Sequence, residues 1–180
     1  MRNKIHDNPV LGLRTEFKEL CEDTKGTRTV AEAILQPGKG IPLHYHNDFS
    51  EYYEVLEGEL KMQVGKEIKV LNKGDYLLVP VKTNHRYYNT SDRPVKFKVV
   101  IQPGNFGFQL LVTVLNGLAR DGKVTNKGLP GNLLVFGYLS VAGGSNIPGI
   151  MSLLQPILNW FHSIAVKKGI DKKLLNAYYK

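Results

Sequence analysis

Cysteine is almost absent from this sequence, since Cys21 is the only one in 180 residues. A single cysteine excludes a disulfide framework within the chain. The opening residues, MRNKIHDNPV, also lack the apolar core and the small-residue cleavage site of a secretory signal. We therefore expect a cytoplasmic, reducing setting. In the predicted strand Arg14 to Glu22, Cys21 shares one face with Phe17, which favours a small packing residue over a nucleophile.

Charge is missing from one long stretch. Residues 128–166 contain no Asp, Glu, Lys or Arg, although these types make up 22% of the chain. Such a stretch predicts burial. Within residues 147–168 the apolar side chains have helical spacing, but prolines and polar residues weaken the case for a transmembrane span. Three alternatives stay open: packing on the rest of the chain, packing in a homodimer, and peripheral contact with an anionic membrane, which Trp160 and the lysines after it would suit.

The overall charge is basic, with 24 Lys and Arg against 16 Asp and Glu, a net charge of +8. An excess of this size raises the possibility of nucleic acid or anionic membranes as partners. No cluster of basic residues interleaved with aromatic ones is present, however, so we expect no nucleic-acid binding. The basic excess has no other explanation in the sequence.

The first part of the chain has the pattern of short β-strands. Between about residues 13 and 102, apolar and polar residues alternate, and Gly, Pro, Asn and Asp separate the segments. This pattern predicts a barrel or a sandwich. The expected strands are Arg14 to Glu22, Thr27 to Leu35, Leu43 to His46, Glu51 to Glu57, Glu59 to Val64, Glu67 to Leu71, Tyr76 to Pro80, His85 to Asn89 and Val95 to Ile101.

After Pro103 the spacing of apolar residues becomes helical. It predicts a helix over residues 106–119 and then two apolar segments, 132–142 and 148–168, divided by the hinge AGGSN. We therefore expect two parts: residues 1–104 form the β-barrel with its N-terminal strands, and residues 105–180 form a C-terminal helical extension.

Three of the five histidines fall in the strand region. Side chains two apart in a strand project from the same face, so His44 and His46 point together while Tyr45 points away. Glu51 begins the next strand, and His85 begins another from which a third imidazole can arrive. Three imidazoles and one carboxylate form a ligand set that suits first-row divalent metals and leaves coordination positions open.

Two segments around these residues resemble the conserved boxes of the cupin superfamily. Residues 38–58 read GKGIPLHYHNDFSEYYEVLEG, and residues 74–89 read GDYLLVPVKTNHRYYN. The resemblance implies a mostly β fold, the cupin jelly-roll barrel or double-stranded β-helix, and identifies His44, His46, Glu51 and His85 as metal ligands. Gly58, Gly74, Pro80 and Asn89 resemble the structural positions of these boxes.

The second box departs from the family pattern once. Lys82 stands where the family usually has glycine two residues after the proline, so we expect the positive-φ turn there to be altered and the loop beside the metal to be reshaped. Lys82 could also attract an anionic substrate, although a solvated loop lysine is the commoner case. Segments before and after the barrel, NPVLGLRTEF and LARDGKVTNKGLPGNLL, look similar to bacterial cupin-domain proteins with a helical extension.

Two tyrosines are further candidates for the site. Tyr53 shares a strand face with Glu51, and Tyr87 shares one with His85, so both could line the pocket and act as catalytic residues. Packing in the core with a satisfied hydroxyl is an equally good interpretation. Glu54 is a poor substitute for Glu51 as a ligand, because an odd offset turns it to the other face.

The resemblance implies a function only in general terms, because cupins include dioxygenases, isomerases, decarboxylases and lyases. Our preferred hypothesis is a mononuclear metal-dependent enzyme, dioxygenase- or isomerase-like, that acts on a small oxygen-rich molecule and uses Fe, Mn, Ni or Zn. The alternative is a non-catalytic module that binds or senses a small ligand through its metal, in solution or at a membrane surface. A third hypothesis, that the barrel is a degraded scaffold for dimerisation, is less favoured because all four ligand positions are intact.

Overall fold

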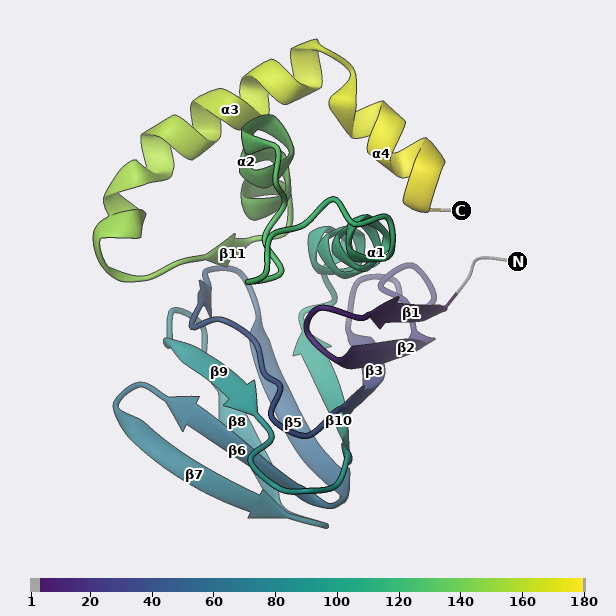
Figure 1. Ribbon diagram of the computed structural model, residues 1–180, viewed down its shortest axis with the longest axis vertical. Helices are drawn as coiled ribbons and strands as arrows, with labels where there is room; N and C mark the ends of the chain where they lie inside the picture. The colour runs from purple at the N-terminus through teal and green to yellow at the C-terminus, as the bar shows by residue number, and fades with distance from the viewer. Residues whose placement is uncertain (1–3, 180) are drawn as a thin grey trace.

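The computed structural model describes residues 4–179, apart from the side chains of residues 150–152. Strands form one part of the molecule and helices gather over one end of it (Figure 1). The strands are β1 (Ile5–Asn8), β2 (Leu13–Glu19), β3 (Thr29–Leu35), β4 (Tyr45–His46), β5 (Ser50–Glu57), β6 (Glu59–Val64), β7 (Glu67–Asn72), β8 (Tyr76–Val79), β9 (His85–Tyr88), β10 (Val95–Gln102) and β11 (Ser145–Asn146).

The strands form two main sheets that share one core. The larger sheet has the order β1-β2-β3-β10-β5-β8, and the smaller has the order β7-β6-β9. Alternate residues of β3, β5, β6 and β10 are buried between the sheets, as the period of two requires. Leu35, Tyr53, Leu60, Met62 and Phe97 are among the core side chains. The predicted mostly β, jelly-roll cupin fold with a helical extension is confirmed, although hydrogen bonding does not close the sheets into one barrel.

The N-terminal strands differ from the sequence prediction. β2 ends at Glu19, after a register shift that begins at Phe17, instead of continuing to Glu22. The chain then turns, and the Asp23 carboxylate accepts a hydrogen bond from the Leu20 N–H at 3.1 Å. Cys21 is therefore in a turn, and the expected shared strand face with Phe17 is wrong. β1 was not expected, because its four residues are too few to show a period.

The helices begin where asparagine side chains cap them. α1 (Phe106–Arg120) starts after Asn105, whose side chain accepts from the Phe108 N–H, and α2 (Leu133–Ala142) starts after Asn132, whose side chain accepts from the Leu134 and Val135 N–H groups. The third apolar segment is one 3-10 stretch (Gly149–Leu154) followed by α3 (Gln155–Lys167). Gly169, at φ 65°, then separates α3 from α4 (Ile170–Tyr178), a helix that the sequence did not predict.

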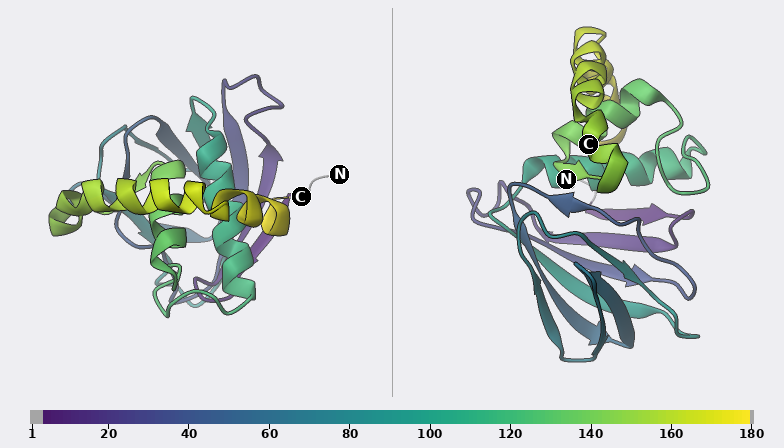
Figure 2. Two further views of the ribbon diagram at one scale, coloured as in Figure 1. Left: turned by 90° about the horizontal axis from the view of Figure 1, so that it is seen from above. Right: turned by 90° about the vertical axis from the view of Figure 1, so that its left-hand side faces the viewer.

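The extension packs on the sheets and on itself. Phe108 and Val112 of α1 contact the core of the sheets. Seen from above, α3 and α4 run across α1 and α2 (Figure 2). α3 approaches α2 closely at Gly137, where a Cβ atom would lie 2.5 Å from the Cβ of Phe161. Packing within the chain therefore accounts for the inner faces of the uncharged stretch. Within residues 4–179, no helix is both long and apolar enough to cross a membrane.

Candidate metal centre

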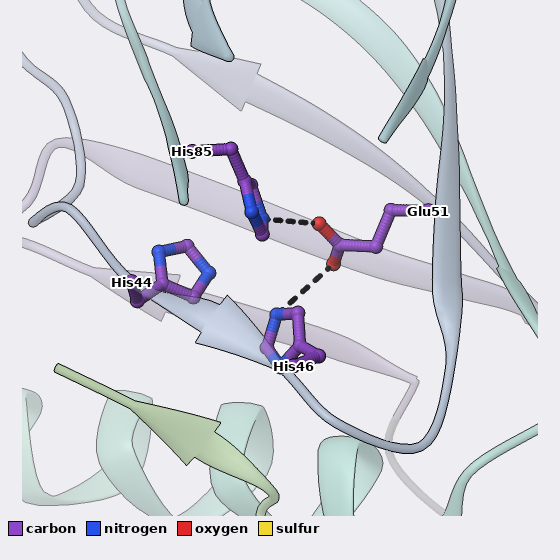
Figure 3. A group of neighbouring side chains, drawn as sticks. All are labelled: His44, His46, Glu51 and His85. Carbon is purple, nitrogen blue, oxygen red and sulfur yellow. Dashed lines mark ion pairs between the residues drawn. The ribbon is translucent and has the colours of Figure 1, made fainter. Parts of the chain in front are cut away.

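The four side chains that the sequence indicated come together in one cluster (Figure 3). His44 and His46 lie at β4, Glu51 is in β5 and His85 begins β9. The backbones of His44 and His85 form an antiparallel bridge, in which the two N–H groups donate to the opposite carbonyls at 3.0 and 2.8 Å. One possible ligand atom from each residue lies within 4.8 Å of all the others.

Each imidazole is held by its Nδ1 atom against a backbone carbonyl. A carbonyl oxygen can only accept a hydrogen bond, so Nδ1 carries the proton in each ring. The lone pair is then on Nε2, which is the atom available to a metal. The three bonds are His44 to Pro42 at 2.9 Å, His46 to Gly144 at 3.0 Å and His85 to Thr83 at 2.8 Å.

Glu51 is buried among these rings, with 3% of its surface exposed. Its Oε2 lies 2.7 Å from His85 Nε2, and its Oε1 lies 3.7 Å from His46 Nε2. The Tyr53 hydroxyl donates to Oε2 at 2.8 Å. The carboxylate is thus fixed on one side by Tyr53 and faces the imidazoles on the other.

The electrostatics of the cluster favour the metal-binding protonation states of Glu51, His44 and His46. Burial by itself raises the pKa of Glu51, but the surrounding imidazoles outweigh burial and hold this pKa at about 2. Burial and the neighbouring rings lower the pKa of His44 to about 3, and burial also lowers the pKa of His46. For His85 the Glu51 carboxylate outweighs burial and raises the pKa. At neutral pH the site offers a carboxylate and neutral imidazoles at His44 and His46.

Two of the imidazole Nε2 atoms lack a hydrogen-bond partner among the described residues. His46 Nε2 and His85 Nε2 are buried and have no well-directed hydrogen bond to any described residue. With its proton on Nδ1, His85 directs a lone pair at a carboxylate oxygen only 2.7 Å away, and two such atoms repel unless a cation lies between them. A proton or a metal ion can supply that charge. The donor set of three nitrogens and one carboxylate fits a first-row divalent metal.

Lys82 adopts a positive φ, the backbone conformation that favours glycine. Its φ is 60°, and its N–H donates to the His46 carbonyl at 2.6 Å. The expected change of turn is therefore wrong: the positive φ persists at a cost of roughly 1 kcal/mol for a residue with a side chain. The Lys82 side chain is exposed and does not belong to the cavity wall.

A cavity of about 190 Å³ extends from His44, His46 and Glu51 into the space between the larger sheet and the helices. Most of its wall is aliphatic or aromatic. The sheet contributes residues such as Ala33 and Val99, and the extension contributes residues such as Leu111 and Leu139. The helical extension is thus the roof of the cavity, and a molecule that reached the metal centre would contact both parts of the chain.

The two candidate tyrosines both line this cavity but differ in their contacts. The Tyr53 hydroxyl is bonded to Glu51, whereas the structure shows no hydrogen bond from the Tyr87 hydroxyl to a described residue. Burial and the Glu51 charge raise the pKa of both phenols. Both therefore keep their protons at neutral pH and can donate a hydrogen bond. Glu54 faces away and forms an ion pair with Lys98.

The sequence did not reveal that the extension takes part in the centre. β11 pairs antiparallel with β4, with Ser145 opposite His46 and Asn146 opposite Tyr45. The preceding Gly144, at φ 61°, carries the carbonyl that accepts from His46 Nδ1. The glycines and asparagine of AGGSN indicated only a hinge. A two-residue strand leaves no periodic signal that could have shown more.

Comparison with known proteins identifies a family for the sheet region. The cupin domain model matches residues 31–101. An uncharacterised protein of Methanocaldococcus jannaschii is 37% identical over 73 residues, which are 40% of this chain and 58% of that protein. Quercetin 2,3-dioxygenase of Bacillus subtilis is 40% identical over 62 residues, which are 33% of this chain and 18% of that enzyme. The chain spans about half the length of the first curated relatives that it matches.

Among solved structures, the chain is similar to a protein of Thermotoga maritima that is described as a predicted oxalate decarboxylase. The TM-score is 0.49 and the identity 24%, over 51% of this chain and 80% of that one.

Proposed function

This chain belongs to the cupin superfamily through residues 31–101, and on that basis we propose that it is a mononuclear metal-dependent enzyme acting on a small oxygen-containing molecule. Its ligands would be His44, His46, Glu51 and His85, and the metal would be Fe, Mn, Ni or Zn. The dioxygenase named among its relatives supports a dioxygenase-like reaction, and a metal that polarises a carbonyl as a Lewis acid would equally serve an isomerase-like reaction.

One observation carries this proposal: three backbone carbonyls hold the Nδ1 protons of the three imidazoles. The Nε2 atoms of His44 and His46 are therefore lone-pair donors, and Nε2 of His85 becomes one when a metal ion takes the place of a proton beside Glu51. Together with the ionised Glu51, these atoms form a buried group of ligands without enough protons to satisfy it. A packed core histidine would instead use both nitrogens in hydrogen bonds. The arrangement is therefore better suited to binding a cation than to stabilising the fold.

A bound metal would polarise a substrate oxygen as a Lewis acid, or exchange electrons if it were iron or manganese. The residues of the chain have three tasks around it. Tyr53 orients the Glu51 carboxylate, and the raised pKa of Tyr87 keeps a proton on a hydroxyl of the cavity wall. The apolar wall excludes water and strengthens every electrostatic interaction inside.

The cavity limits the size and character of the substrate. Its volume of about 190 Å³ lies below the roughly 300–1,000 Å³ of pockets for drug-sized ligands. The polar groups nearest the metal centre are Glu51 and the two tyrosines, and most of the remaining wall is apolar. We therefore propose a small, mainly apolar molecule with an oxygen group that faces the metal.

A second candidate function is a binding or sensing module without turnover. The pairing of β11 with β4 favours it, because this contact joins a metal ligand directly to the segment that leads from α2 to α3. Occupancy of the site would then be transmitted to the helices. Release of a chemically changed molecule by the metal-loaded protein would decide in favour of the enzyme.

The first test is the metal content of the protein purified without a histidine tag. We expect about one first-row metal ion per chain, and its loss in the double variant His44→Ala, His46→Ala. His162→Ala is the matched control, because this histidine stacks on Tyr138 in the extension and lies outside the cluster. Equal metal in the parent and the double variant would remove the basis of the proposal.

A further inference from the structure

A pair of buried asparagines joins the N-terminal strand to the roof of the cavity. Asn8 ends β1 and is 1% exposed, and Asn116 lies in α1 and is 3% exposed. The Asn8 Nδ2 group donates to Asn116 Oδ1 at 3.0 Å. Asn116 is also part of the cavity wall, whereas Asn8 is not. The pair therefore places a polar side chain on an otherwise mainly apolar surface.

The backbone fixes which way both amides point. The Leu11 N–H donates to Asn8 Oδ1 at 3.0 Å, so this atom must be the carbonyl oxygen. The amide nitrogen of Asn8 is then the group that faces Asn116, and it needs an acceptor. Asn116 therefore presents its own amide oxygen as that acceptor. The N–H of Leu11 thus determines the orientation of Asn116 through Asn8.

As a result the amide nitrogen of Asn116 has nothing to bond. It is buried and has no acceptor among residues 4–179. A buried donor left without an acceptor costs roughly 1–3 kcal/mol. Asn116 belongs to the cavity wall, so a bound molecule that contacted this nitrogen would remove that cost. An apolar side chain would fill the same place without this energetic cost.

Asn116 contacts the edge strand β1 through Asn8, whereas the metal ligand Glu51 is in β5, four strands further along the larger sheet. β1, which carries Asn8, is separated from β5, which carries Glu51, by β2, β3 and β10. At about 4.8 Å per strand, this path is roughly 19 Å along the curved sheet. Thr15 of β2 lines the cavity near the Asn116 end, and Ala33 and Val99 line it between the ends. Along this path the cavity wall thus has Asn116 and Thr15 near one end, Glu51 near the other, and apolar side chains between them.

We propose that Asn116 is a specificity-determining residue, whose amide N–H donates to an oxygen acceptor at the far end of the ligand that the metal holds. The ligand class is an elongated small molecule with a metal-binding oxygen group at one end, an apolar middle, and a carbonyl or similar acceptor at the other. This inference rests on the proposed metal site and adds the chemistry of the distal end. Asn8 acts through Asn116 and is a positioning residue.

The test uses straight-chain hydroxamates of increasing length, each beside an analogue with a ketone carbonyl at its far end. Binding to the full-length, metal-loaded protein is measured by calorimetry. At one chain length we expect the ketone to bind about tenfold more tightly than its parent, because a buried donor gains an acceptor. The ratio within each pair is the readout, since a general loss of structure would weaken both members equally.

Two variants separate the donor from the fold. Asn116→Leu should abolish the preference for the ketone while the parent hydroxamates bind as well as before. Asn8→Asp should reverse the preference for the ketone. The introduced carboxylate still accepts from the Leu11 N–H but cannot donate to Asn116. Asn116 then turns its amide nitrogen toward the carboxylate and its oxygen toward the ligand. This second variant keeps both side-chain volumes nearly unchanged.

The outcomes distinguish this inference from the proposed function. If the parent hydroxamates bind but no ketone binds better at any length, the role of Asn116 is overturned and the metal site stands. A ketone preference that persists in Asn116→Leu overturns it as well. If no hydroxamate binds to the metal-loaded protein, the substrate site itself is refuted, and the role of Asn116 falls with it.

Discussion

The Nδ1 atom of His46 lies 3.0 Å from the carbonyl oxygen of Gly144, a residue 98 positions further along the chain. The bond joins the first cupin box to the helical extension. It fixes the ring of one proposed ligand from outside the cupin domain itself, which the family model limits to residues 31–101.

Substitution of Gly144 should therefore weaken metal binding from a distance. Gly144 has φ 61°, which a residue with a Cβ atom rarely adopts, so Gly144→Ala should shift the carbonyl away from His46. Groups that orient metal ligands typically change affinity 10–100-fold. We expect a loss of about tenfold, measured by competition with a chromogenic chelator.

Gly122→Ala is the matched control for that experiment. Gly122 also has a positive φ, of 69°, and an added Cβ would meet no atom within 4 Å. Both variants should lose similar stability, but Gly122→Ala should keep the metal affinity of the parent. Equal affinity losses would show that the effect is general and not transmitted through His46.

Lys82→Gly should stabilise the protein, because it removes a side chain from a left-handed backbone conformation. We expect the free energy of unfolding to rise by about 1 kcal/mol in denaturant titration. Lys25→Gly, at φ 53° and outside the cupin boxes, should give a similar gain. Metal affinity should stay unchanged in both, since the Lys82 side chain is exposed. A loss of stability at position 82 alone would mean that its side chain has a role in the loop.

The two tyrosines should respond differently to removal of their hydroxyls. Tyr53→Phe takes away the donor that fixes Glu51 Oε2, so metal affinity should fall about tenfold. Tyr87→Phe should leave metal affinity unchanged but weaken turnover, if Tyr87 donates to the substrate. The same chelator competition, followed by a substrate assay, measures both. A drop in metal affinity with Tyr87→Phe would contradict these separate roles.

The outer side of α3 and of the 3-10 stretch before it should be covered by a second copy of the chain. Leu153, Ile157 and Trp160 are 76%, 46% and 60% exposed, and exposed apolar patches commonly mark interfaces. We expect a dimer in sedimentation velocity and a monomer for Trp160→Ser, whereas Val166→Ser should stay dimeric. A parent protein that sediments as a monomer and binds anionic vesicles would refute the dimer and favour the membrane alternative.

The sequence predicted the strands well because each buried strand repeats with a period of two and ends at Gly, Pro, Asn or Asp. It also predicted that the candidate ligands lie close together, because strand geometry and two recognisable motifs both indicate the same four residues: His44, His46, Glu51 and His85. These are local signals. The resulting cluster was confirmed as a group of neighbours, and its occupancy by a metal stays a prediction.

Other features could not be predicted because they depend on packing between distant segments. The pairing of β11 with β4 involves two residues on each side. The unpartnered nitrogen of Asn116 results from a hydrogen bond of Leu11, more than one hundred positions away. Neither residue type nor spacing in the sequence indicates such a chain of contacts.

The pairing of β11 with β4 has a consequence for the modularity of this chain. β4 would otherwise be a free sheet edge, open to strands of other molecules. A fragment ending before the helices would expose that edge beside its own histidines. A metal site transplanted into another scaffold would therefore need residues 145–146 together with the first box. The two segments form one structural unit despite their separation in the chain.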